Sequence, residues 1–333
     1  MSLPAKIISH SNLQILKNEN SFNPELEYEF FHNFQSPHTR KSYRIDISQF
    51  FEFLRDNFSL ILNYQDIKRV HFVAFRNWLT DSNLAPKSVN RKLAANSSFF
   101  DFLVEKNIIA FNPSTSIKRP RQDVVKPTND VSDEQIRHLL ELVECQKGPG
   151  LLHKAVLYTL FTTGIRKAEL INLKIKNFSM KNGFYIIEIR AKGGKQLTKV
   201  IHPKCAEVIN EYLEYLKSES NEINGSLHPE DWIFRPSKNP LDPNQLIKPL
   251  NPKSVDYIIK TWCHKAGIDQ RISPHSARAS YIGSALESGV DLYKISRDVG
   301  HASVKTTEEY NKRRQKLSES PVFGLGFMDK KKD

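Results

Sequence analysis

Apolar residues recur every three or four positions in the first third of the chain, which is typical of amphipathic helices. One such run extends from residue 39 to 54 and a second from 86 to 104. Each run ends in a Phe-Phe-acid-Phe-Leu segment that begins 13 residues after a proline, Pro37 or Pro86. A short duplication and two independent helices with a shared Phe-rich core face explain this repeat equally well. In either case, the first third of the chain is predicted to be helical.

The rest of the chain mixes helical periodicity with a β-rich region. Residues 184–189 and 196–201 have the composition of strands, and the glycine-containing segment 191–195 between them predicts a hairpin turn. Residues 221–252 are rich in Asn and Pro and are expected to be mostly loop, with a short strand at 232–234. Helices are expected at 151–161, 165–174, 251 or 254 to 267, 274–289 and 291–299, and a capping box at 306–309 predicts one more.

A segment without apolar periodicity separates these two regions. Residues 117–127 contain two prolines and four cations, which is typical of an extended connector. At 333 residues the chain is also longer than one average domain. The predicted division is an N-terminal extension (1–21), a helical domain (22–116), a linker (117–131), a second domain (132–318) and a C-terminal tail (319–333).

The composition narrows the class of partner. Lys and Arg outnumber Asp and Glu by 49 to 37, a net charge of +12 that favours a polyanion. No segment approaches the roughly 20 apolar residues of a membrane helix, and no basic region followed by an apolar block opens the chain, so a cytoplasmic protein without membrane insertion is expected. The cysteines, Cys145, Cys205 and Cys263, are far apart and lack CxxC spacing, so neither a disulfide framework nor a zinc site is predicted.

Several polar residues in the second half lie at the ends of predicted elements, where packing gives no reason for them. Taken singly, each has an ordinary explanation as a surface ion pair, a solvated lysine, a helix cap or a half-buried tyrosine. His275 and Arg278 are three residues apart and therefore project from one face of a helix. The complete set is Arg166, Glu169, Lys192, His275, Arg278, His301 and Tyr310.

Together these residues meet the requirements of phosphoryl transfer from DNA. The pentacoordinate state of a phosphodiester carries charge on two non-bridging oxygens, which two guanidiniums can clamp. A phenol, with a pKa of about 10, is a nucleophile that an alkoxide can later displace. An ammonium can protonate the departing 5′ oxygen, and imidazoles can donate to phosphate or accept the phenol proton. Arg166 and Arg278 fit the role of the two guanidiniums, and Tyr310 that of the phenol. Lys192 fits the role of the ammonium, and His275 and His301 fit those of the imidazoles.

Four segments also carry a resemblance to a known family. They read TGIRKAEL from Thr163, AKGGK from Ala191, PHSAR from Pro274 and VGHASVKTTEEY from Val299. In these segments the chain resembles the tyrosine recombinases, the family of the phage integrases and Xer recombinases, and the resemblance extends over roughly residues 22–318. It implies a mainly α fold with a small β-sheet in the C-terminal domain. The N-terminal part would be a helical SAM-like core-binding domain, and the C-terminal part a tyrosine-recombinase catalytic domain.

The resemblance also implies residue roles. They are activation of the phosphate by Arg166 and Arg278, general acid catalysis by Lys192, further catalytic contributions from His275 and His301, nucleophilic attack by Tyr310, and support of the site by Glu169. Ala277 and Val299 stand where the family commonly has Leu, and both are apolar residues that can pack. Asn311-Lys-Arg-Arg314 replaces the family's usual Thr-His after the tyrosine, which could change contacts near the cleaved strand. An additional arm-type DNA-binding domain is not expected within the first 20 residues.

The implied reaction cuts and rejoins double-stranded DNA through a 3′-phosphotyrosyl intermediate, without metal, cofactor or ATP. The implied assembly is a homotetramer on two DNA sites, alone or with a second recombinase. Chromosome dimer resolution, mobile-element integration or excision, and segment inversion all stay open as its role. The apolar tail residues Phe323, Leu325 and Phe327 are expected to dock on their own domain or on a neighbouring protomer.

Helices 39–57 and 86–105 are expected to lie near the DNA major groove, where their cations would contact phosphates. The competing interpretations are a type IB topoisomerase, a DNA-binding protein without catalysis, and a metal-dependent nuclease. Relaxation of a plasmid that lacks the target site would favour the first, and sensitivity of cleavage to EDTA the last. The predicted DNA contacts are Arg40, Lys41, Arg44, Lys87, Arg91 and Lys92.

Overall fold

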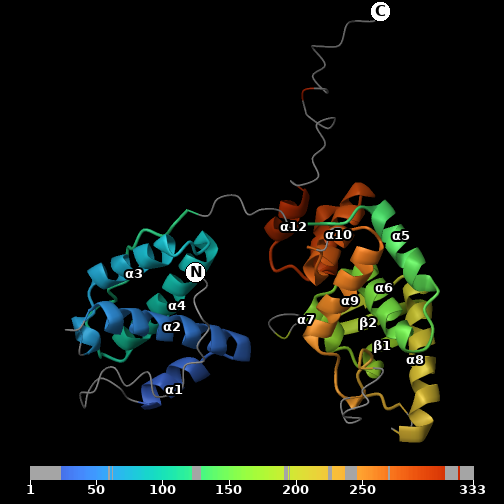
Figure 1. Cartoon of the computed structure of the whole chain (residues 1–333), viewed down its shortest axis with the longest axis horizontal. Coiled ribbons are helices and arrows are strands. Elements are labelled where there is room, and N and C mark those ends of the chain that lie inside the picture. The colour runs from blue at the N-terminus through green and yellow to red at the C-terminus, as the bar shows by residue number, and fades with distance from the viewer. Residues whose placement is uncertain are drawn as a thin grey trace, which may run out of the picture. The chain divides into compact units, whose positions relative to one another are not determined.

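The structure is a computed structural model that describes residues 24–58, 61, 63–121, 129–190, 194, 196–223, 227–236, 246–268, 271–311 and 322. The chain forms two compact units, Met1–Val125 and Lys126–Asp333 (Figure 1). The first unit is built from helices, and the second combines helices with a small antiparallel sheet. The predicted fold class, mainly α with a β-sheet in the C-terminal part, is confirmed.

Phenylalanine rings form the core of the N-terminal unit. Its helices are α1 (Pro24–His32), α2 (Pro37–Asn57), α3 (Arg69–Asp81) and α4 (Pro86–Glu105), with the 3-10 turn η2 (Tyr64–Asp66) before α3. Phe50 of α2 and Phe100 of α4 are fully buried, and their ring centroids lie 4.4 and 5.1 Å from that of Phe72 on α3. Such offset and edge-on contacts are the preferred aromatic geometries. The two helices predicted from the apolar periodicity therefore meet through their Phe-rich faces.

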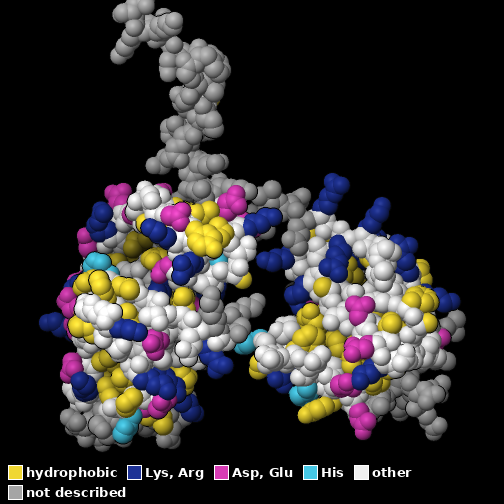
Figure 2. All heavy atoms as spheres, turned by 180° about the vertical axis from the view of Figure 1, so that it is seen from behind, with side chains coloured by type: hydrophobic (Ala, Val, Ile, Leu, Met, Phe, Trp, Pro, Cys, Tyr) yellow, Lys and Arg dark blue, Asp and Glu magenta, His cyan; other side chains and the backbone are white. Residues whose placement is uncertain are grey.

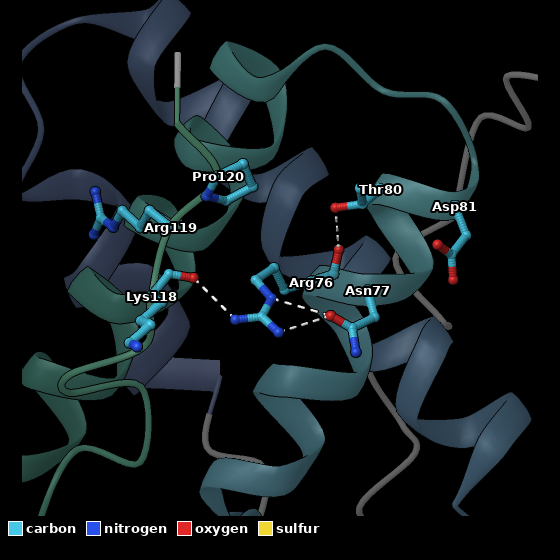
Figure 3. A pocket seen from close by; sticks show the side chains of 7 residues that line it. All are labelled: Arg76, Asn77, Thr80, Asp81, Lys118, Arg119 and Pro120. Atoms are coloured by element: carbon cyan, nitrogen blue, oxygen red, sulfur yellow. Dashed lines mark hydrogen bonds between the residues drawn. The ribbon is translucent and has the colours of Figure 1, made fainter. Parts of the chain in front are cut away.

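The first residues of the predicted linker are held against α3 and α4. Figure 3 shows the guanidinium of Arg76 between the Lys118 carbonyl and the Asn77 side chain, at the edge of a pocket. Arg76 Nη1 donates to the Lys118 carbonyl at 3.0 Å, and Asn90 Nδ2 donates to the Pro120 carbonyl at 3.0 Å. The chain is thus packed on the N-terminal unit as far as Pro120.

Helix α6 is the centre of the C-terminal unit (Figure 1). It is buried along most of its length and contacts α5, α8, α9 and α10. Val131, near the end of the predicted linker, is fully buried in this unit, and its N–H donates to Ser280 Oγ at 2.7 Å. The helices are α5 (Asp133–Glu144), α6 (Leu151–Thr163), α7 (Lys167–Ile171), α8 (Pro203–Ile223), α9 (Pro252–Lys265), α10 (Pro274–Glu287), α11 (Leu292–Asp298) and α12 (Val304–Asn311), with 3-10 turns η3 (Gly148–Gly150) and η4 (Ile175–Asn177).

The sheet of this unit has the order β1 (Phe178–Lys181), β2 (Phe184–Arg190) and β3 (Gln196–Val200), and both pairings are antiparallel. Ile187 in the central strand pairs with Phe178 of β1 and with Lys199 of β3. The predicted strands at 184–189 and 196–201 are confirmed as β2 and β3. Strand β1 was not predicted, because its sequence, Phe-Ser-Met-Lys, contains no β-branched residue.

Two predicted helices differ from the observed ones. The helix expected over 165–174 is only α7, because the chain turns at Asn172 and enters η4 and β1. The prediction that a capping box at 306–309 starts the last helix was wrong. Helix α12 begins at Val304, and Ser303 Oγ accepts from the Lys305 N–H at 3.3 Å. A serine three residues earlier thus takes the capping position.

Glycines end two helices at the point where site residues follow. Gly164 closes α6 with φ +61°, and Gly300 follows α11 with φ +65°, a left-handed conformation that glycine adopts without strain. A Cβ at Gly164 would lie 2.5 Å from the ring of Tyr281, so this position also needs the small residue for close packing. Arg166 follows Gly164 by two residues, and His301 directly follows Gly300.

Candidate active site

Arg278 on α10 forms the buried base of the site, with only 2% of the residue exposed. Its Nη1 donates to the carbonyl of Gly164 at 2.7 Å, and its Nη2 donates to that of Val299 at 2.5 Å. Burial lowers the pKa of Arg278 to about 10, and the Arg166 guanidinium adds to this effect. Because that value remains well above neutral pH, the side chain stays charged while the two carbonyls fix its orientation.

Arg166 precedes α7 and is oriented by Glu169. Glu169 Oε1 accepts from Arg166 Nη1 at 2.7 Å, and Oε2 accepts from the Arg166 backbone N–H at 2.7 Å. Arg166 Nη2 also donates to the Gly300 carbonyl at 3.3 Å. The carboxylate is buried, whereas 34% of the Arg166 side chain is exposed. The guanidinium is therefore fixed in position and still accessible to an anion.

The guanidiniums of Arg278 and Arg166 lie close together, because they donate to the consecutive carbonyls of Val299 and Gly300. The region around these two carbonyls is termed the corner of the unit. The charge of Arg166 is one of the causes that lower the pKa of Arg278, so the two cations repel each other. An anion between them would relieve this repulsion. The arrangement is suited to bind an anionic phosphate.

Tyr310 reaches the same corner from α12. Its side chain is buried, at 7% exposure, in a small apolar cluster with Ala279, Ile282 and Val299. Its hydroxyl lies 3.5 Å from Nε2 of His275, an exposed residue in the first turn of α10. The phenol and an imidazole able to accept its proton are thus neighbours within one chain.

His301 stacks on the ring of Tyr310, with the centroids 6.1 Å apart and the planes 13° from parallel. Burial lowers the pKa of His301 to about 4, and the charges of Arg278 and Arg166 contribute. The imidazole is therefore neutral at pH 7. Its Nδ1 lies 2.7 Å from Oγ1 of the fully buried Thr307. With Thr307 as donor, the ring proton is on Nε2, from which it can be donated to a phosphate oxygen.

The structure thus brings most of the predicted set to one place. Lys192 lies outside the described residues, and so do the tail residues Phe323, Leu325 and Phe327. Thr307 was not predicted, although its position three residues before Tyr310 on α12 was an available signal. The residues brought together are Arg166, Glu169, His275, Arg278, His301 and Tyr310.

An ionic cluster around the buried Lys199, which was not predicted, lies beside this corner. The Nζ of Lys199 on β3 pairs with Oδ2 of Asp298 and donates to the Asp298 carbonyl at 3.2 Å. Tyr281 donates its hydroxyl to the same Oδ2 at 2.8 Å. Burial lowers the pKa of Lys199, although the Asp298 carboxylate acts in the opposite direction. Inward-pointing Leu197 and Lys199 alternate with exposed residues in β3, and this alternation was the available signal.

In the N-terminal unit, the predicted DNA contacts on α4 differ in availability. Lys87 is exposed. The Arg91 guanidinium pairs with Asp46 of α2, yet 49% of its side chain is exposed. Lys92 is only 8% exposed, and its Nζ donates to the other oxygen of the fully buried Asp46 at 2.9 Å. Lys92 therefore joins α4 to α2 and is not placed to contact a phosphate, so we exclude it from the proposed DNA contacts.

The three predicted DNA contacts on α2 also differ in their exposure and partners. Lys41 is exposed, whereas Arg40 donates from Nη2 to the Gln35 carbonyl at 3.3 Å. Arg44 lies over the ring of Phe31, 4.7 Å from its centroid, and its Nε is 3.5 Å from a carboxylate oxygen of Glu27. Figure 2 shows Lys and Arg side chains on the visible face of both units, with acidic side chains among them.

Three further features concern the part of the chain that the structure describes. None of its helices is long and apolar enough to cross a membrane. No group of His, Cys, Asp or Glu side chains within it is arranged to hold a metal ion. In the same part, Cys205 and Cys263 are buried free thiols and Cys145 is an exposed one.

Comparison with known families agrees with this geometry. The model of the phage integrase family matches residues 129–316, which is more than half of the chain. The model of the phage integrase N-terminal SAM-like domain matches residues 29–107. The chain therefore belongs to the phage integrase family, with the two domain types that the resemblance implied.

Individual relatives narrow this assignment. Tyrosine recombinase XerC of Syntrophus aciditrophicus is 29% identical over 280 residues, which cover 83% of this chain and 87% of the relative. Tyrosine recombinase XerD of Oceanobacillus iheyensis is 27% identical over 294 residues, covering 86% and 93%. The predicted membership of the Xer-like tyrosine recombinases, enzymes that cleave and rejoin DNA, is confirmed.

Solved structures share the fold. The XerH site-specific recombinase, bound to palindromic difH substrate in a post-cleavage complex, superposes with a TM-score of 0.68 at 17% identity, and the match covers 96% of this chain and 94% of XerH. At this identity the likeness concerns the arrangement of the elements. It agrees with the helical N-terminal unit and the mixed C-terminal unit described above.

Proposed function

We propose that this protein is a site-specific recombinase in which Tyr310 attacks the scissile phosphate of double-stranded DNA. The observation that carries the proposal is the buried Tyr310 side chain at the corner that holds Arg166 and Arg278. The attack forms a bond between the phenolic oxygen and phosphorus and breaks the bond from phosphorus to the 5′ oxygen. The products are a 3′-phosphotyrosyl link and a 5′ hydroxyl, which then attacks the corresponding link in the partner strand. Each step exchanges one phosphodiester for another, so no nucleotide hydrolysis is needed.

The proposed roles follow from charge and proton availability. Arg166 and Arg278 compensate the charge that develops on the non-bridging oxygens. His275 accepts the proton of Tyr310, and the neutral His301 donates from Nε2 to a non-bridging oxygen. Lys192 protonates the departing 5′ oxygen, a role that rests on the sequence resemblance alone.

DNA binding is proposed to depend on the accessible cations of α2 and α4. Lys41 and Lys87 are exposed, and the Arg91 side chain is half-exposed. Phosphate contacts of this kind dominate affinity and make it strongly dependent on salt. Arg40, which donates to the Gln35 carbonyl, and Arg44, which pairs with Glu27 of α1, are proposed to contribute from the same surface.

The proposed assembly is a homotetramer on two DNA sites, alone or with a second recombinase. We propose that the C-terminal tail, with Phe323, Leu325 and Phe327, docks on a neighbouring protomer. Deletion of residues 319–333 should then leave binding to a single site intact and abolish cooperative pairing of two sites. Full recombination by the truncated protein would rule out this role of the tail.

The proposed cellular role is chromosome dimer resolution, or integration and excision of a mobile element, in the cytoplasm. The relatives named XerC and XerD, and the XerH complex with its difH substrate, support action at a specific DNA site. The identity of the DNA site distinguishes between these roles.

One experiment tests the proposal and identifies the site. The protein is purified under denaturing conditions from an extract of its own cells, and the DNA that remains covalently attached is sequenced. We expect one recurrent DNA site from the wild type and none from Tyr310→Phe, which should still bind that site in a mobility-shift assay. Equal covalent DNA from Tyr310→Phe would contradict the assignment of the nucleophile. A nicked suicide substrate with the recovered site then serves for rate measurements.

A further inference from the structure

The cluster of Lys199, Asp298 and Tyr281 joins three separate elements. Lys199 comes from β3, Tyr281 from α10, and Asp298 ends α11. Besides its bonds to Asp298, the Lys199 ammonium lies 4.8 Å from the centroid of the Tyr281 ring. Only 1% of the Lys199 side chain is exposed. Lys199 is therefore inaccessible to DNA, whereas 35% of the Asp298 side chain is exposed.

This cluster adjoins the carbonyls that orient the two arginines. Asp298 directly precedes Val299 and Gly300, whose carbonyls accept from Arg278 and Arg166. Lys199 donates to the carbonyl of Asp298 itself, so it holds the backbone of this segment as well as the side chain.

The same cluster also reaches the third carbonyl, that of Gly164, which accepts from Arg278 Nη1. The ring of Tyr281 packs so closely on Gly164 that a Cβ there would lie 2.5 Å from the ring. Strand β3 also packs against Gly300, because the Leu197 side chain would lie 3.3 Å from a Cβ at that position. The three carbonyls that orient Arg166 and Arg278 therefore belong to residues that contact the cluster or follow it closely in the chain. They are those of Gly164, Val299 and Gly300.

We propose that Lys199, Asp298 and Tyr281 form a brace that positions Arg166 and Arg278 for transition-state stabilisation. These three are positioning residues, since they act through the backbone at Gly164 and at 298–300 rather than by contact with the reacting atoms. The inference rests on the proposed function, because it assigns the brace to the same phosphoryl-transfer site.

Stability alone is a weak explanation of such a cluster. Burial of the Lys199 ammonium costs its hydration, so its pairing with Asp298 gains little net free energy over an apolar residue of similar size. Its advantage is directional, since hydrogen bonds from Lys199 and Tyr281 fix Asp298 and hence the two carbonyls that follow it. Precise orientation matters at this site because guanidiniums stabilise the transition state only when they are aimed at the charged oxygens.

The test measures the single-turnover rate of covalent adduct formation at saturating protein on the suicide substrate. Lys199→Met should lower this rate about 30-fold, and Tyr281→Phe, which keeps the ring on Gly164, about fivefold. Lys199→Arg should restore most of the loss. On a substrate with a neutral methylphosphonate at the scissile position, the loss in Lys199→Met should shrink to about threefold, because less charge is left for the arginines to compensate.

The matched control is Lys154→Met. Lys154, near the start of α6, is another buried lysine of the same unit. Its ammonium pairs with Glu144 of α5 and Glu211 of α8. It should lower the thermal stability comparably and leave the adduct rate within about twofold of the wild type. Equal adduct rates for Lys199→Met, Tyr281→Phe and the wild type would overturn the brace, as would a loss of the same size on both substrates. Absence of an adduct with the wild type would instead contradict the proposed function.

Discussion

The hydroxyl of Tyr310 lies 3.5 Å from Nε2 of His275, although the two residues are 35 positions apart and belong to different helices. This distance places a proton acceptor beside the proposed nucleophile within one chain. His275→Ala should therefore lower the adduct rate about 100-fold and leave DNA affinity unchanged. The exposed His228→Ala is the control, with an expected rate equal to that of the wild type. A wild-type rate in His275→Ala would remove this residue from the mechanism.

Glu169 should matter mainly through Arg166. Glu169→Gln retains an acceptor for the Arg166 backbone N–H but loses the charged partner of the guanidinium. We expect an adduct rate about tenfold lower and a loss of about 1 kcal/mol in the free energy of unfolding, measured by urea denaturation. In Arg166→Ala the further change Glu169→Gln should have no additional effect on the rate, since the residue it orients is already absent. An additive loss in the double variant would show an independent role.

His301 should make the stability of the C-terminal unit depend on acid pH. Its pKa is about 4 in the folded protein, below the ordinary value of 6.5, so the unfolded chain binds the proton more readily. The stability contribution is therefore present above pH 6.5 and is lost as the pH falls from 6.5 towards 4. His301→Gln should reduce the decline of Tm across this range, measured by circular dichroism against the wild type. An identical decline in both proteins would mean that His301 is not the group responsible.

Lys87 and Lys92 both belong to α4, but their substitution should have opposite effects on stability and on the salt dependence of DNA binding. Lys87→Ala should leave Tm unchanged and reduce the slope of log affinity against log salt by about 1, the value expected for one lost phosphate contact. Lys92→Met should destabilise the protein by about 3 kcal/mol, because it removes one partner of the buried Asp46. Its salt slope should equal that of the wild type. The reverse pattern would restore Lys92 to the DNA contacts and remove Lys87.

Local patterns in the sequence predicted much of the fold. Apolar periodicity located α2 and α4, and the glycine-containing turn located the pairing of β2 with β3. The candidate catalytic residues were also accessible, because Arg166, His275 and Tyr310 lie in short segments that resemble the tyrosine recombinases. These features depend on neighbours within a few residues.

Contacts between distant positions were not predictable in the same way. Lys92 was assigned to DNA because a cation on an amphipathic helix is usually solvated, and its partner Asp46 is 46 positions away. Lys199 was overlooked for the same reason, since Asp298 is 99 positions further along the chain. A buried charge is explained only by its partner, and that partner becomes visible in the folded structure.

The most direct measurement of the central claim is the chemical identity of the link between protein and DNA. The adduct formed on the suicide substrate is digested with nuclease and protease, and the DNA-linked peptide is sequenced by mass spectrometry. The account predicts a single modified residue, Tyr310, that carries the 3′ phosphate of the cleaved strand, with a free 5′ hydroxyl on the other fragment. A link at any other residue, or through a 5′ phosphate, would contradict it.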